Sequence, residues 1–169
     1  GSAADLVLAF AGTVTEHTGT VNITDAPTVA QLVTINSETT GAITLAVTNG
    51  ALSGSAADLV LAFAGTVTEH TGTVTITGVA NATDLTTIAA ATSGTITASG
   101  VTNITGTAAD IISAHNNTEL SSIDSDFTVN ITDAPTVAQL VTINSETTGD
   151  ITLAVTNGAL LGSAADLLL

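Results

Sequence analysis

Apolar anchor residues recur along the chain at intervals of 26 to 29 residues. The anchors are Leu6, Leu32, Leu59, Leu85, Ile111, Leu140 and Leu167. Each has a small apolar residue three positions before it, and further apolar residues often follow at +1, +3 or +4. This spacing places the apolar side chains on one stripe of a helix. The pattern predicts that every unit begins with a short amphipathic helix.

Start and stop signals bracket these predicted helices. Residues suited to N-capping precede each anchor by four positions: Ser2, Thr28, Ser55, Asn81, Thr107, Thr136 and Ser163. Asp or Gln follows each cap at the third position, as in a capping box. Pro27 and Pro135 stand just ahead of a cap. Glycines nine or thirteen residues past an anchor are expected to end the helices: Gly19, Gly41, Gly72, Gly94 and Gly149.

Strict alternation of apolar residues with Thr or Asn follows the helices and predicts strands. The apolar pairs are Val21/Ile23, Ile43/Leu45, Val74/Ile76, Ile96/Ala98, Val129/Ile131 and Ile151/Leu153. Each unit therefore reads as helix, turn, strand, turn.

Such short elements bury their apolar faces only by stacking on one another. The expected fold is α/β: a right-handed solenoid of helix-turn-strand coils with one parallel sheet backed by helices. An all-β solenoid, with residues 6–10 as a further strand, is the alternative. Residues 1–169 are expected to form a single repeat solenoid of about six and a half coils, open at both ends as a window of a longer array.

Segments of the sequence that are close to or longer than one coil are also duplicated. Residues 1–21 recur as 54–74. Residues 21–59 recur as 129–167, with Asp150 in place of Ala42 and Leu161 in place of Ser53.

Composition narrows the possible partners. The chain has no Lys or Arg and 15 acidic residues, for a net charge of −15. Without cations to meet phosphate, we expect no nucleic-acid binding and no docking to anionic membranes. No apolar run approaches the ~20 residues of a membrane helix, so we expect no membrane insertion. Cysteine is absent, so stability must come from packing and backbone hydrogen bonds.

The segments GSAADLVLAFAG, TVAQLVTINSETTGAITL and GTAADIISAHNN resemble the Ala/Thr-rich tandem repeats of giant cell-surface proteins of marine cyanobacteria, which include swimming-motility and adhesin-like proteins. The resemblance covers essentially the whole chain. It implies an extracellular, structural segment and carries over no catalytic residue. The calcium-binding nonapeptide G-G-x-G-x-D of many bacterial surface repeats is absent.

Two groups of carboxylates are candidates for calcium. Asp58, Asp84 and Asp110 share one position in three consecutive coils, which would form a ladder of ligands. Capping of each helix explains the same column. Asp124 and Asp126, with Asp133 nearby, form an acidic cluster in the irregular fifth unit, for which a solvated turn is the alternative. Calcium is thus possible, and no other cofactor is expected.

The three histidines do not form a recognisable catalytic motif in the sequence. His17 and His70 are copies within Thr-Glu-His-Thr, and His115 precedes two Asn residues. No nucleophile motif or oxyanion turn accompanies them, and a repeated residue indicates a structural unit. The sequence therefore predicts that the protein is not an enzyme.

The outward strand positions form a candidate binding face of hydroxyl and amide side chains. Its residues are Thr20, Asn22, Thr44, Thr73, Thr75, Thr95, Thr97, Asn130 and Thr152. Such a face could hold carbohydrate, ice or mineral, or pack laterally on another copy. Thr is also simply a good strand former on a solvated face.

We therefore expect a structural repeat segment of an extracellular surface-layer, adhesin or filament protein, located at the cell surface and associating with itself end to end or laterally. The alternative is a binding module that uses the Thr/Asn face, with carbohydrate as a possible partner.

Overall fold

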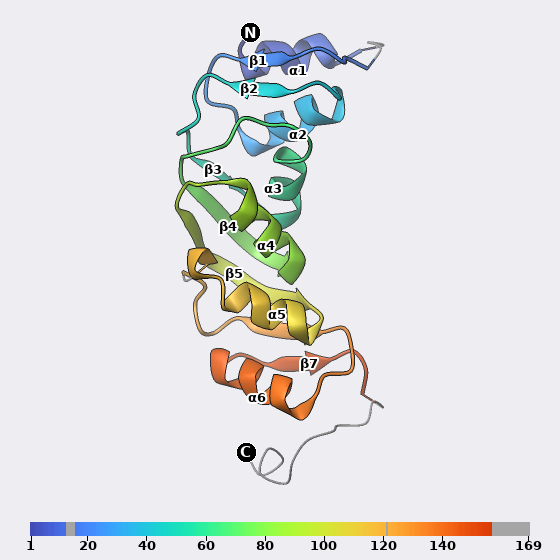
Figure 1. Ribbon diagram of the computed structural model, residues 1–169, viewed down its shortest axis with the longest axis vertical. Helices are drawn as coiled ribbons and strands as arrows, with labels where there is room; N and C mark the ends of the chain where they lie inside the picture. The colour runs from blue at the N-terminus through green and yellow to red at the C-terminus, as the bar shows by residue number, and fades with distance from the viewer. Residues whose placement is uncertain (13–15, 121, 157–169) are drawn as a thin grey trace.

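The computed structural model describes residues 1–12, 16–120 and 122–156 (Figure 1). They contain six α-helices and seven strands. The helices are α1 (Ala3–Phe10), α2 (Val29–Ser37), α3 (Ala56–Ala62), α4 (Ala82–Ala91), α5 (Ala108–His115) and α6 (Val137–Glu146), and a 3-10 turn, η1, spans Thr118–Leu120. The strands are β1 (Val21–Ile23), β2 (Ile43–Leu45), β3 (Leu52–Gly54), β4 (Val74–Asn81), β5 (Ile96–Gly106), β6 (Thr128–Ile131) and β7 (Ile151–Leu153). The α/β class is confirmed. The all-β alternative is wrong, because residues 6–10 belong to α1.

The elements follow one another in chain order along an elongated molecule (Figure 1). Strands β3 to β7 form a five-stranded parallel sheet in the order of the sequence, and β1 pairs with β2 in a second parallel ladder. A bridge from Ile43 of β2 to Val67 continues this ladder towards the next helical unit. Each helix packs against the helix that follows it, from α1 to α6.

The hydrophobic core lies between the helices and the strands. The anchors Leu32, Leu59 and Leu85 are fully buried, and Ile111 nearly so. The inward apolar residues of the predicted strands are buried from β1 to β6, as their alternation predicted. At the two ends, the anchors Leu6 and Leu140 are only half-buried. The interior anchors lie on helices that pack between two other helices, whereas Leu6 and Leu140 lie on the first and last helices of the series.

The six N-caps that fall on described residues are confirmed, from Ser2 to Thr136. Ser163 lies outside the described residues. A reciprocal capping box forms only in α2 and α6, where Gln is the third residue after the cap. Asp is one methylene shorter than the Glu or Gln of a capping box. Asp58 accordingly accepts a hydrogen bond from the hydroxyl of the cap Ser55 instead of its backbone N–H.

The interpretation of the glycines as helix stops is wrong. Helix α4 ends at Ala91, three residues before Gly94. A Cβ atom placed on Gly94 would lie 1.8 Å from the carbonyl oxygen of Gly72, and one on Gly41 would lie 1.8 Å from that of Gly19. Gly149 approaches the backbone of Phe127 in the same way. These glycines are required because the backbones of consecutive units touch there.

Strands β4 and β5 are longer than the five residues that the alternation predicted. Their pairing starts with Val74 opposite Ile96 and ends with Asn81 opposite Thr105, so the offset grows from 22 to 24 residues. Two register shifts absorb the extra residues, and Gly78 sits at the second with a φ of 81°. Such a positive φ favours glycine.

Candidate functional site

The predicted Thr/Asn face exists as a surface. None of its nine residues is buried. Buried apolar neighbours flank Asn22, Thr44, Thr75, Thr97 and Asn130, and half-buried ones flank Thr152. Pairing places Asn22 beside Thr44, and Thr75 between Ser53 and Thr97. Paired residues of neighbouring strands are about 4.8 Å apart. Short rows of hydroxyl and amide side chains therefore run across the strands.

These rows are not continuous over the whole molecule. The neighbour of Asn130 on β5 is Thr105 and not Thr97, because β6 pairs only with the second half of that strand. After β2, the ladder passes to residues 66–68, where the Thr68 hydroxyl is used within the chain and donates to the Ile43 carbonyl (3.3 Å). The face thus consists of separate rows. The longest rows that contain predicted residues are Ser53, Thr75, Thr97 and Asn81, Thr105, Asn130, Thr152.

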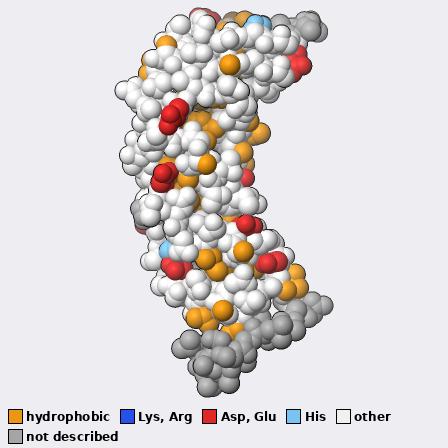
Figure 2. Space-filling view, viewed as in Figure 1, with side chains coloured by type: hydrophobic (Ala, Val, Ile, Leu, Met, Phe, Trp, Pro, Cys, Tyr) orange, Lys and Arg blue, Asp and Glu red, His pale blue; other side chains and the backbone are white. Residues whose placement is uncertain are grey.

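Two of the three aspartates in the predicted column interact with the cap of their helix. Asp58 and Asp110 accept hydrogen bonds from the Ser55 and Thr107 hydroxyls at 2.8 and 2.7 Å. At α4 the cap is Asn81, which accepts from the Thr83 backbone and hydroxyl and leaves Asp84 out of that interaction. On the face drawn in Figure 2 the acidic side chains appear as separate spots.

The aspartates of the acidic cluster in the fifth unit have different environments in the structure. Asp124 and Asp126 are exposed, whereas Asp133 is half-buried and accepts a hydrogen bond from the backbone N–H of Ala108 (2.9 Å). Asp25 binds Ala3 of α1 in the same way (2.7 Å). Both residues thus cap the helix of the preceding unit, and the solvated-turn interpretation of Asp133 is wrong. Across the described ranges, no three His, Asp or Glu side chains gather as metal ligands. Calcium binding by any of these aspartates stays a prediction.

The three histidines occupy different environments. His70 is buried, its Nε2 lies 2.6 Å from the Gly50 carbonyl oxygen, and its ring packs on Phe63. Its copy His17 is exposed beside Phe10. His115 links α5 to α6 through Glu146 at 2.8 Å. Each interaction joins neighbouring parts of the fold.

Threonines that link consecutive units by hydrogen bonds were not predicted from the sequence, and each such arrangement is called a threonine latch below. Thr92 is buried, donates from its hydroxyl to the His70 carbonyl (2.7 Å) and accepts from the Gly94 N–H (3.0 Å). Thr39 and Thr147 repeat the arrangement with Gly41 and Gly149. The available signal was the recurrence of Thr-x-Gly after three of the helices.

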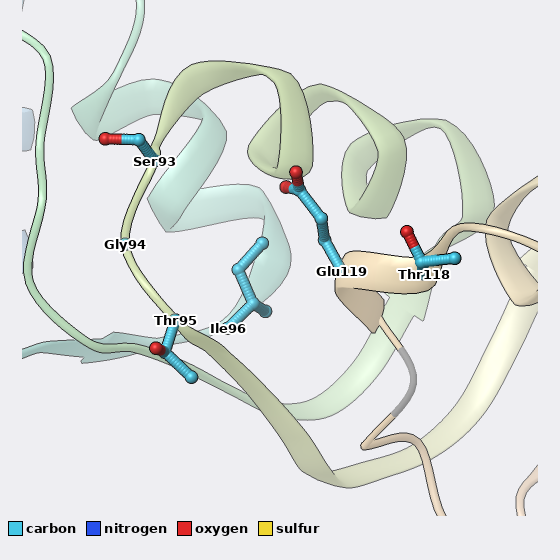
Figure 3. Close-up of a pocket in the computed structure, with 6 residues that line it drawn as sticks. All are labelled: Ser93, Gly94, Thr95, Ile96, Thr118 and Glu119. Atoms are coloured by element: carbon cyan, nitrogen blue, oxygen red, sulfur yellow. The ribbon is translucent and has the colours of Figure 1, made fainter.

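One open hollow lies between the start of β5 and η1 (Figure 3). Its lining residues are Ser93, Gly94, Thr95, Ile96, Thr118 and Glu119. Ile96 and Glu119 point towards it, whereas the side chains of Ser93 and Thr95 point away (Figure 3). A catalytic site needs polar groups that converge on a substrate. This hollow presents a single carboxylate and supplies no such constellation.

Comparisons with known proteins give no assignment: no family model matches the chain, and no curated protein or solved structure is significantly similar to it. Within the described part of the chain, no helix has the length and apolar character needed to cross a membrane.

Proposed function

We propose that the chain is a right-handed α/β solenoid that serves as a structural repeat segment of an extracellular surface-layer, adhesin or filament protein. The main observation that supports this proposal is that helices and strands contact one another in the order of the sequence. Helices α2 to α5 each pack between the helix before and the helix after, and the strands pair in the same order. In such an array every unit contacts only its neighbours, so length is gained by adding units.

Several polar side chains support this proposal because they join one unit to the next. Asp133 caps the helix of the preceding unit, and the Thr92 latch binds the carbonyl of another. The resemblance to repeats of giant cell-surface proteins points the same way. A charge of −15 without any Lys or Arg is best tolerated in salty or calcium-rich surroundings, where it is screened.

Single-molecule stretching tests the structural role. The chain, placed between two handle domains, is expected to release its length in steps of about 90 Å, the contour length of one 26-residue unit. The reason is that each unit is held by its neighbours and not by one common core. The handle domains alone serve as the control. Release of the whole chain in one event would contradict the proposal.

Binding through the Thr/Asn face is the second candidate, favoured by the row Ser53, Thr75, Thr97. Its ligand would be a neutral polysaccharide, because the charge of the chain repels anionic ones. Replacing Thr75 and Thr97 by Tyr is expected to lower retention on such a polysaccharide about tenfold or more, since the rings cover the row. Thr87→Tyr, on an exposed position of α4, is the matched control. Equal retention of all variants would exclude this role for the face.

A further inference from the structure

Five segments of the chain carry the acceptor motif for N-linked glycosylation, Asn-x-Thr with a middle residue other than Pro. Their asparagines are Asn22, Asn81, Asn103, Asn116 and Asn130. The sugar is attached to the asparagine side chain, and such motifs act as acceptors in surface loops of secreted proteins. All five motifs lie within the described residues. The fold therefore distinguishes segments that the sequence alone makes equivalent.

Three of the five motifs belong to strands. Asn22 lies in β1, Asn103 in β5 and Asn130 in β6. Strand β1 pairs with β2, and β5 and β6 each pair with a strand on both sides. The Asn103 amide also donates to the Thr128 hydroxyl (2.7 Å), and its Oδ1 accepts from the Thr105 hydroxyl (3.0 Å). An enzyme could bind these segments only after the hydrogen bonds between strands had opened.

The motif at Asn81 is used to start a helix. Asn81 is the N-cap of α4, and its Oδ1 accepts hydrogen bonds from the Thr83 backbone N–H (3.1 Å) and from the Thr83 hydroxyl (2.9 Å). Both polar side chains of this motif are thus engaged with each other. Modification of Asn81 in the folded chain would require the first turn of α4 to open.

The motif Asn116-Asn117-Thr118 lies in the turn between α5, which ends at His115, and η1. Asn116 and Thr118 are both exposed. Within the described residues neither side chain is used in a hydrogen bond, in contrast to Asn81 and Asn103. The acceptor amide and the hydroxyl that completes the motif are therefore both accessible from solvent.

The backbone of this turn is held by local hydrogen bonds. The Asn116 N–H donates to the Ile112 carbonyl (3.0 Å), and the Asn117 N–H donates to the Ala114 carbonyl (3.2 Å). The Asn117 carbonyl accepts from the Leu120 N–H (3.0 Å). These partners belong to α5 and η1, so the bonds can open without separating two strands. Local opening costs the least free energy where few contacts between distant segments are lost.

We propose that Asn116 is a site of N-linked glycosylation that is accessible in the folded chain. The co-reactant is a glycosyl diphosphate donor. A bond forms between the Asn116 Nδ2 atom and C1 of the sugar, the bond between C1 and the diphosphate oxygen breaks, and the amide loses one proton. A neutral sugar at this exposed position adds nothing to the charge of −15. The inference rests on the proposed function in one respect, because an extracellular location favours use of the motif.

Treatment of the folded chain with a soluble N-glycosyltransferase and UDP-glucose tests the proposal. A protease that cleaves at Asp then places each motif in a different fragment, with Asn116 between Asp110 and Asp124. Mass spectrometry is expected to find about tenfold or more hexose on Asn116 than on any other motif. Asn116→Gln and Thr118→Ala should each abolish this label. Asn22→Gln is the matched control at an exposed strand position and should leave the label on Asn116 unchanged.

Fragments digested before the enzyme is added separate the effect of the fold from that of the local sequence. All five are expected to accept hexose, and the comparison is made among motifs whose fragments do so. Equal labelling of Asn116 and Asn22 in the folded chain would overturn the proposal. Absence of label on Asn116, in the folded chain or in its fragment, would overturn it too. None of these results alters the stepwise release of length on stretching, so failure of this inference is distinguishable from failure of the proposed function.

Discussion

Replacing Gly94 by Ala is expected to lower the free energy of unfolding by about 3 kcal/mol or more. The added Cβ would lie 1.8 Å from the Gly72 carbonyl oxygen and 2.7 Å from its carbonyl carbon. Both are backbone atoms of the preceding unit and cannot turn aside as a flexible side chain could. The two units must separate, which also stretches the bonds that Thr92 makes to His70 and Gly94. The smaller backbone entropy of Ala in the unfolded chain offsets only about 0.4–1 kcal/mol.

Gly12→Ala is the matched control, because a Cβ there has no neighbour within 4 Å and the φ is not positive. Its effect should stay within about 1 kcal/mol. Urea unfolding followed by circular dichroism measures both variants, since the chain has no Trp or Tyr for fluorescence. Gly41→Ala should reproduce the loss, as its Cβ would meet Gly19 at the same distance. Equal stability of the Gly94 and Gly12 variants would contradict the close backbone contact.

Helix starts and strand positions were predictable because their signals are local. A Ser or Thr cap acts on a backbone N–H two or three residues away, and alternation in a strand reports burial on one face. Thr28 with Gln31 and the Val21/Ile23 pair both needed nothing beyond a few neighbouring residues. The anchors Leu32 and Leu59 were likewise fixed by their spacing.

Contacts between units could not be predicted from the same signals. Gly94 looks like a helix stop in sequence, and only the position of Gly72, 22 residues earlier, reveals why Cβ is excluded. Asp133 caps a helix 25 residues before it, which no local pattern encodes. The rows of the Thr/Asn face also depend on how the strands pair: β6 pairs with the second half of β5, which places Asn130 beside Thr105 and not beside Thr97. The sequence therefore predicted the helices and strands of each unit better than the contacts and the strand register between units.

Leu59→Ala should lower the free energy of unfolding by about 3 kcal/mol, whereas Leu6→Ala should cost about 1 kcal/mol. The two leucines have identical neighbours in sequence for five residues before and fifteen after. They differ in burial: Leu59 is fully buried and Leu6 is half-buried at the end of the molecule. Truncation at Leu59 leaves a cavity between stacked units, but truncation at Leu6 removes a side chain that is already partly in water.

The comparison tests what stacking contributes, because the local sequence, and with it the helix propensity and the Ser N-cap, is the same at both positions. Urea unfolding of the two variants measures it, and Leu61→Ala, on the exposed side of α3, controls for the loss of a leucine from the helix. In a linear array a change in the end unit affects mainly that unit, so Leu6→Ala should leave the interior transition in place. Equal destabilisation by Leu6→Ala and Leu59→Ala would mean that the anchors are buried within their own units. The stacked arrangement would then not be the source of stability, and the structural role built on it would lose its basis.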